Sequence, residues 1–148
     1  MDQPLYPRYH QNLLIPGLVL LLGAMGAPAG ACGEGEARRI FDRVADLMHV
    51  RVEAAWPCPQ IVLRQEMAPD RFSALLGLET NGRVFPAYIP SANLIVVEPG
   101  RPDLLAHELA HYFQVVYWGV TENDPRDTVE RQATAVEAIV REEEAGRP

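Results

Sequence analysis

Residues 101–119 read RPDLLAHELAHYFQVVYWG, and the interpretation of the whole chain depends on them. A proline and an aspartate near the start suit the first turn of a helix, and apolar side chains then follow on every side of the helix axis. A helix without a polar face belongs in the interior of a domain. The stretch therefore predicts a buried helix that carries two histidines, His107 and His111, and one glutamate, Glu108.

The spacing of these three residues predicts a metal site. Residues four apart on a helix are separated by about 40° around the axis, so His107 and His111 can offer nitrogens to one ion. Glu108 points about 100° to the side, where it can take a proton from a water molecule that the ion activates. Buried imidazoles and carboxylates are costly without strong partners, and a metal ion is such a partner. A hydrolytic zinc site needs one more protein ligand.

The helix that follows offers two candidates for this third ligand. Asp124 is expected to cap it and Pro125 to occupy its first position. Glu130 and Glu137 are seven residues apart, so they lie nearly on one face. Either carboxylate can reach the first helix if the two helices pack antiparallel across residues 121–124. His10 and His49 are not expected to be ligands.

The sequence HELAHYFQ, followed by a glutamate and an alanine three residues apart at Glu130 and Ala133, resembles the gluzincins. These are zinc metallopeptidases with an HExxH helix and a second helix that supplies a glutamate ligand. The resemblance covers about residues 83–140. It implies that His107, His111 and Glu130 bind Zn²⁺ and that Glu108 is the general base. It also implies a zincin-like fold, in which the strand before the motif helix pairs with an extended peptide substrate.

The chain departs from the family pattern behind the ligands. Many gluzincins have an aspartate four residues after the ligand glutamate, where it accepts a hydrogen bond from a ligand histidine. This chain has Thr134 at that place, and Asp127 is one turn before the ligand. An oxyanion donor is also needed, and the available phenols are Tyr88, Tyr112 and Tyr117.

Periodicity over the rest of the chain predicts an α+β domain. Apolar residues at helical spacing indicate an amphipathic N-terminal helix over residues 34–52. Short apolar runs predict strands at 60–64, 83–89 and 93–98. The stretch 67–77 between the first two is ambiguous, and a short helix that opens at Pro69 and Asp70 is one interpretation of it. We expect a small antiparallel or mixed sheet, with substrate added as a further strand at an exposed edge near residues 83–98.

The first 31 residues predict export. A positively charged leader, an apolar run and a small-residue end are typical of a signal peptide, which leaves residues 32–148 as one domain outside the cytoplasm. Residues 29–32 also resemble a lipobox, so a lipid on Cys32 is an alternative that would attach the domain to a membrane surface. A disulfide between Cys32 and Cys58 is the other use of that sulfur, and each excludes the other.

Charge and motif together define two classes of function. The net charge of −7, without a basic cluster, argues against nucleic acid as a partner. The first hypothesis is an exported zinc metallopeptidase that hydrolyses peptides or proteins. The second is a non-catalytic exported domain that keeps zinc or binds a partner.

Overall fold

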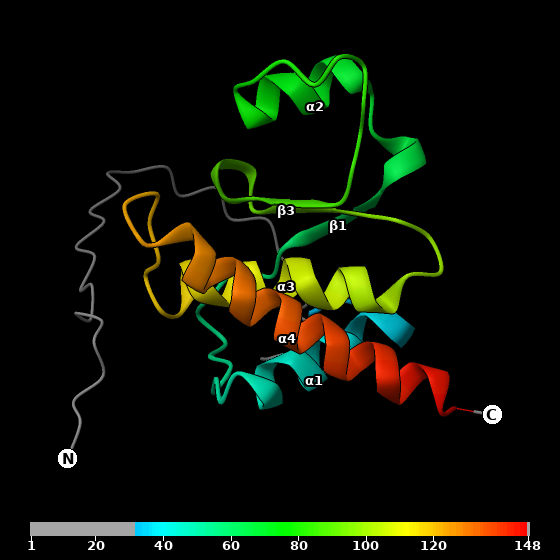
Figure 1. Ribbon diagram of the computed structural model, residues 1–148, viewed down its shortest axis with the longest axis vertical. Helices are drawn as coiled ribbons and strands as arrows, with labels where there is room; N and C mark the ends of the chain where they lie inside the picture. The colour runs from blue at the N-terminus through cyan, green and yellow to red at the C-terminus, as the bar shows by residue number, and fades with distance from the viewer. Residues whose placement is uncertain (1–31, 148) are drawn as a thin grey trace, which may run out of the picture.

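A central helix, α3 (Pro102–Val116), lies between a small sheet and two other helices in this computed structural model (Figure 1). The structure describes residues 32–147. On one side of α3 is a sheet with α2 on its outer face, and on the other side are α1 and α4. The expected α+β class is confirmed. The elements around α3 are α1 (Gly35–Leu47), β1 (Gln60–Leu63), α2 (Pro69–Leu76), β2 (Ala87–Ile89), β3 (Leu94–Val97) and α4 (Arg126–Ala145), with single 3₁₀ turns at Arg64–Glu66 and Pro90–Ala92.

The sheet is mixed and has the order β1-β3-β2. β3 is parallel to β1 and antiparallel to β2. Since β3 is hydrogen-bonded on both sides, it cannot pair with a substrate strand as the resemblance implied, whereas β2 supplies the edge that was expected near residues 83–98. The edge strands are β1 and β2. The segment 83–89 forms a strand only from Ala87, because Pro86 has no backbone donor for the ladder.

The alternating faces of β3 separate two apolar cores. Ile95 and Val97 face the core that α1, α3 and α4 share, whereas Leu94 and Val96 pack with Phe72 of α2. All four residues of β3 are buried. A short strand with no polar face is what a central position between two helical layers requires.

Helix α1 ends five residues earlier than the apolar pattern indicated. His49 adopts φ +53°, and the N–H groups of His49 and Val50 donate to the carbonyls of Asp46 and Ala45. This is a Schellman motif, which satisfies the last carbonyls of a helix and stops it. Histidine occupies the left-handed position that glycine usually takes.

The start of α4 also differs from the expectation. Pro125 is the residue before the helix, and Asp124 does not cap it. The Asp124 carboxylate instead accepts hydrogen bonds from the backbone N–H and the hydroxyl of Thr121, at 2.6 and 3.0 Å. Asp124 therefore closes the loop between α3 and α4, which is short enough to fold the two helices antiparallel.

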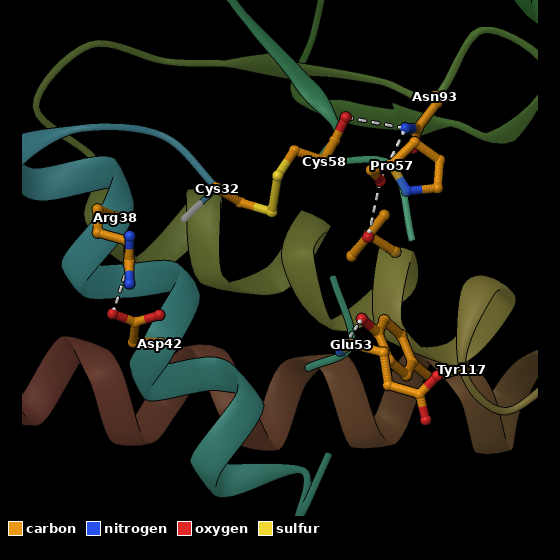
Figure 2. Close-up of a disulfide and its surroundings, with 9 residues drawn as sticks. Cys32, Arg38, Asp42, Glu53, Pro57, Cys58, Asn93 and Tyr117 are labelled. Atoms are coloured by element: carbon orange, nitrogen blue, oxygen red, sulfur yellow. Dashed lines mark hydrogen bonds and ion pairs between the residues drawn. A yellow bond between two sulfur atoms is a disulfide. The ribbon is translucent and has the colours of Figure 1, made fainter. Parts of the chain in front are cut away.

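A disulfide joins Cys32 to Cys58 and ties the segment before α1 to the segment before β1 (Figure 2). The Cys32 sulfur is thus bonded to Cys58, which is incompatible with a lipid on the same atom. A disulfide is compatible with a location outside the cytoplasm. None of the helices within residues 32–147 combines the length and apolar character needed to cross a membrane. The expected signal peptide, residues 1–31, lies outside the described residues.

Candidate metal centre

Three predicted ligand atoms converge between α3 and α4. The Nε2 atoms of His107 and His111 are 3.1 Å apart, and the Glu130 Oε2 atom lies 3.5 Å from the first and 3.6 Å from the second. His107 and His111 come from successive turns of α3, and Glu130 comes from the second turn of α4. All three residues are partly buried. The antiparallel packing that the sequence required is present.

The triangle of donor atoms fits a tetrahedral metal ion. Zinc with bonds of about 2.0–2.2 Å to imidazole nitrogen and carboxylate oxygen holds its donor atoms roughly 3.3–3.6 Å apart. The three observed separations span nearly the same range. Two imidazoles and one carboxylate also leave a fourth position for water or substrate, as in hydrolytic zinc sites.

The stripe of α3 that carries the histidines is not fully buried, contrary to the expectation for this helix. Positions 104, 107, 111 and 115 are half-buried, while the residues between them, at 105–106, 108–110 and 112–114, are buried. Each imidazole side chain keeps 17% of its surface exposed, and the Glu130 side chain keeps 44%. The donors are therefore held by the core but remain accessible from solvent.

Glu137 contacts His107 at the other ring nitrogen. Its Oε2 atom lies 2.9 Å from His107 Nδ1, and its other oxygen bonds with Arg141. A carboxylate at Nδ1 fixes the ring orientation and leaves Nε2 as the metal-binding nitrogen. The structure thus places Glu130 with the donor triangle and Glu137 behind His107.

This arrangement changes the interpretation of Thr134. Among residues 32–147, neither Thr134 nor Asp127 forms a hydrogen bond with a site histidine, and both side chains lie at the surface. The orienting carboxylate expected four residues after Glu130 is found seven residues after it. Asp127 does not substitute for the missing aspartate.

Sequence reasoning missed Gln114, which orients the second histidine. Its side-chain oxygen lies 2.8 Å from His111 Nδ1. The only signal in the sequence was a polar residue one turn after the motif, within an otherwise apolar helix.

Glu108 is buried beside the donor triangle. It retains 8% of its surface exposed, and one carboxylate oxygen accepts a 2.7 Å hydrogen bond from the backbone N–H of Tyr88 in β2. Burial raises the pKa of Glu108 to about 7, although the nearby His107 and the Tyr88 N–H oppose that rise. A carboxyl group with a pKa near neutrality is suited to both accepting and releasing a proton.

The three candidate phenols bond to groups outside the donor triangle. The Tyr88 hydroxyl donates to Asn93 Oδ1 at 3.4 Å, and the Tyr112 hydroxyl donates to the Pro57 carbonyl at 3.0 Å. The Tyr117 hydroxyl accepts a hydrogen bond from the Glu53 N–H at 3.2 Å (Figure 2). These tyrosines support the fold around α3, and none of the three bonds presents a phenol to the candidate metal.

Two hollows on the described surface lie away from the donors. Neither is lined by His107, His111 or Glu130. The larger measures about 570 Å³ and the smaller about 410 Å³. The larger is bounded by residues 64–69 and 82–85, and the smaller by residues 100–103, Arg141 and Glu144.

Comparisons with protein-family models, with curated proteins and with solved structures found no match to this chain. The assignment of the site therefore depends on its own chemistry.

Proposed function

We propose that this domain is a zinc-dependent metallopeptidase in which His107, His111 and Glu130 hold the ion and Glu108 is the general base. The observation that carries the proposal is the convergence of two imidazole nitrogens and a carboxylate oxygen within 3.1–3.6 Å, next to a buried glutamate. Three electron-pair donors at this separation repel one another unless a proton or a metal ion lies between them. Their residue types and number are those of a hydrolytic zinc site.

Each residue of the site has a role in the proposed hydrolysis of a peptide bond. A bound zinc ion supplies Lewis acidity, which activates water and polarises a carbonyl oxygen. Glu108 accepts the proton of the attacking water and delivers it to the leaving amine. The Tyr88 N–H holds the Glu108 carboxylate in one orientation during both transfers. Glu137 and Gln114 keep the two imidazoles turned toward the ion.

The metal content of the purified protein tests the first half of the proposal. We expect about one zinc ion per chain by atomic emission, and much less in His107→Ala. A zinc content below about half an ion per chain that His107→Ala leaves unchanged would show that the three donors do not form a metal site.

Glu108→Gln tests the second half. The amide keeps the shape of the side chain but cannot accept the proton, so we expect zinc to be retained and peptide hydrolysis to be lost. The assay follows cleavage of a mixture of unstructured peptides by mass spectrometry. Hydrolysis by Glu108→Gln at the rate of the unchanged protein would rule out Glu108 as the base.

A non-catalytic zinc-binding domain is the second candidate. One observation favours it: each of the three candidate phenols bonds to a group outside the donor triangle. This candidate predicts one zinc ion per chain, no hydrolysis of any peptide in the mixture, and no functional difference between Glu108→Gln and the unchanged protein.

We also propose that the domain functions outside the cytoplasm. The signal-peptide pattern of residues 1–31 and the Cys32–Cys58 disulfide support this location. Unstructured peptides and proteins in that compartment are the proposed substrates.

A further inference from the structure

Gln114 is a buried polar side chain in the core of the domain. It retains 1% of its surface exposed and follows Tyr112 and Phe113, which are fully buried. A buried amide is destabilising unless its donors and acceptor find partners. The partners of this amide connect the two helices that supply the metal donors.

The hydrogen bonds of Gln114 fix which way its amide is turned. Nε2 donates to the backbone carbonyl of Val129 at 2.9 Å and to Gln132 Oε1 at 3.0 Å. A main-chain carbonyl only accepts hydrogen bonds, so the NH₂ group must face α4. The Gln114 oxygen must then face His111, where it lies 2.8 Å from Nδ1.

This orientation dictates the tautomer of His111. An amide oxygen only accepts hydrogen bonds, so His111 must carry a proton on Nδ1. The Nε2 atom then presents its lone pair to the space that it shares with His107 and Glu130. Without the Gln114 oxygen, the proton would be free to move to Nε2 and block metal binding there.

The NH₂ group of Gln114 helps to position the third donor, the Glu130 carboxylate. Val129 directly precedes Glu130, so the bond from Gln114 to the Val129 carbonyl holds the turn of α4 that presents the Glu130 carboxylate. One side chain thus constrains a donor on each helix.

We propose that Gln114 is a positioning residue for the metal site, which sets the His111 tautomer and holds the Glu130 turn. This role rests on the proposed zinc site. The simpler alternative is that Gln114 only satisfies buried polar groups between α3 and α4. That alternative predicts a change in stability without a selective change at the metal donors.

The tautomer of His111 is measured first, in the unchanged protein without metal. Long-range ¹H–¹⁵N correlation spectra distinguish a protonated Nδ1 from a protonated Nε2, and we expect the proton on Nδ1. A proton on Nε2 of His111 would overturn the proposal, whatever the behaviour of any variant.

Gln114→Leu then removes both ends of the amide while keeping its approximate size. We expect zinc affinity, measured by competition with a chromophoric chelator, to fall by about 10–100-fold. The visible spectrum of the Co²⁺ form should also change, because that spectrum reports the geometry of the donors. Affinity and spectrum equal to those of the unchanged protein would overturn the proposal.

Gln114→Glu separates the two ends of the side chain and remains informative if the leucine variant does not fold. Its carboxylate still accepts the Nδ1 proton of His111 but has no donor for the Val129 carbonyl. We expect the Nδ1 tautomer to be kept and zinc affinity to fall less than in Gln114→Leu. In a folded Gln114→Glu protein, loss of the Nδ1 tautomer would contradict the proposed role.

Two control variants distinguish positioning from general loosening. Val140→Ala leaves a space in the core of α4 and should lower the unfolding temperature without changing zinc affinity. Gln132→Ala removes a partner of Gln114 that does not contact His111, so it should change affinity less than Gln114→Leu. If Val140→Ala weakened zinc binding as much as Gln114→Leu, the effect would be one of stability alone. If the unchanged protein bound no zinc, the proposed function itself would be wrong.

Discussion

His107 meets a different carboxylate at each of its ring nitrogens. Glu130 Oε2 lies 3.5 Å from Nε2, and Glu137 Oε2 lies 2.9 Å from Nδ1. Both glutamates are on the face of α4 that turns toward α3, so spacing alone left the choice of ligand open. The two roles, metal ligand and orienting group, are distinguished by which ring nitrogen of His107 each carboxylate contacts. A carboxylate that shares its space with both Nε2 atoms is a ligand candidate, and one at Nδ1 is an orienting group.

Substitution of the two glutamates should therefore give unequal losses of zinc affinity. We expect Glu137→Ala to weaken binding by about 10–100-fold, because the His107 ring loses its orienting partner. Glu130→Ala should weaken it more, because one of three ligands is gone. Competition with a chelator measures both zinc affinities. The control is Glu142→Ala, at an exposed position of the same helix, which should leave zinc affinity unchanged. A larger loss in Glu137→Ala than in Glu130→Ala would reverse the two assignments.

At the scale of elements, α3 and α4 pack antiparallel through a series of side-chain contacts. Residues met in order along α4 contact residues in reverse order along α3. Val129 bonds with Gln114, Glu130 lies against both histidines, Glu137 bonds with His107, and Arg141 bonds with Asp103. The candidate metal site is one of these contacts, so any change that shifts the helices should also move its donor atoms.

The contact between Arg141 and Asp103 predicts a pH dependence of stability. The buried Asp103 carboxylate accepts hydrogen bonds from Arg101 and Arg141, and those from Arg101 hold its pKa well below the usual range. A depressed folded-state pKa stabilises the fold above the unfolded pKa of about 4, and this stabilisation is lost as pH falls through the folded-state value. At pH 7 we expect Asp103→Asn to lower the free energy of unfolding by about 1–3 kcal/mol.

Urea unfolding at several pH values checks this expectation. The difference between the unchanged protein and Asp103→Asn should shrink steadily below about pH 4. Asp42→Asn is the matched control, because its exposed pair with Arg38 should contribute less than about 1 kcal/mol. If the difference in the free energy of unfolding stayed constant down to pH 2, the charge of the Asp103 carboxylate would not be the source of the stabilisation.

At the scale of the whole molecule, the Cys32–Cys58 bridge joins the start of α1 to the half of the domain that carries the sheet. Next to the bridge, the Asn93 side chain donates to the carbonyls of Pro57 and Cys58 (Figure 2). The hydroxyl of Tyr112, from α3, bonds to the same Pro57 carbonyl. The segment before β1 is thus held by α3, by the end of the 3₁₀ turn at 90–92 and by the disulfide.

Removing the bridge should lower stability without removing the metal site. The bridged residues are 26 apart in the sequence, and closing a loop of this size contributes about 3.5 kcal/mol. For the Cys32→Ser and Cys58→Ser double variant we expect a drop of roughly 10–15 °C in the unfolding temperature. Zinc stoichiometry measured below the lowered midpoint should match that of the unchanged protein. An unchanged unfolding temperature would show that the bridge does not stabilise the native fold.

Zinc should stabilise the whole domain, because the donors are assembled only in the folded state. At a free zinc concentration about a thousand times the dissociation constant, we expect the free energy of unfolding to rise by about 4 kcal/mol. Scanning calorimetry with zinc and with a chelator measures the difference. The His107→Ala and His111→Ala double variant should show none, and an equal zinc effect in that variant would indicate binding elsewhere.

Local pattern was enough to predict most of the helices and strands. The helix around HELAH, the helix after it and the three strands all follow from periodicity and from proline and glycine positions, and the structure confirms that these elements exist. The errors at the helix ends fall where another local hydrogen-bond pattern competes with the predicted one. His49 takes a left-handed conformation that ends α1, and Asp124 binds Thr121 instead of capping α4.

The residue pattern alone predicted the candidate donors, which are two histidines one turn apart and a carboxylate on the next helix, together with a glutamate beside the first histidine. This was possible because helical geometry relates sequence spacing to direction over one or two turns. Only the tertiary structure assigned Glu130 and Glu137 to different nitrogens of His107, brought Gln114 to His111, and made β3 the central strand. Those outcomes depend on the register between α3 and α4 and on the order of strands, which are set by packing between segments distant in the sequence.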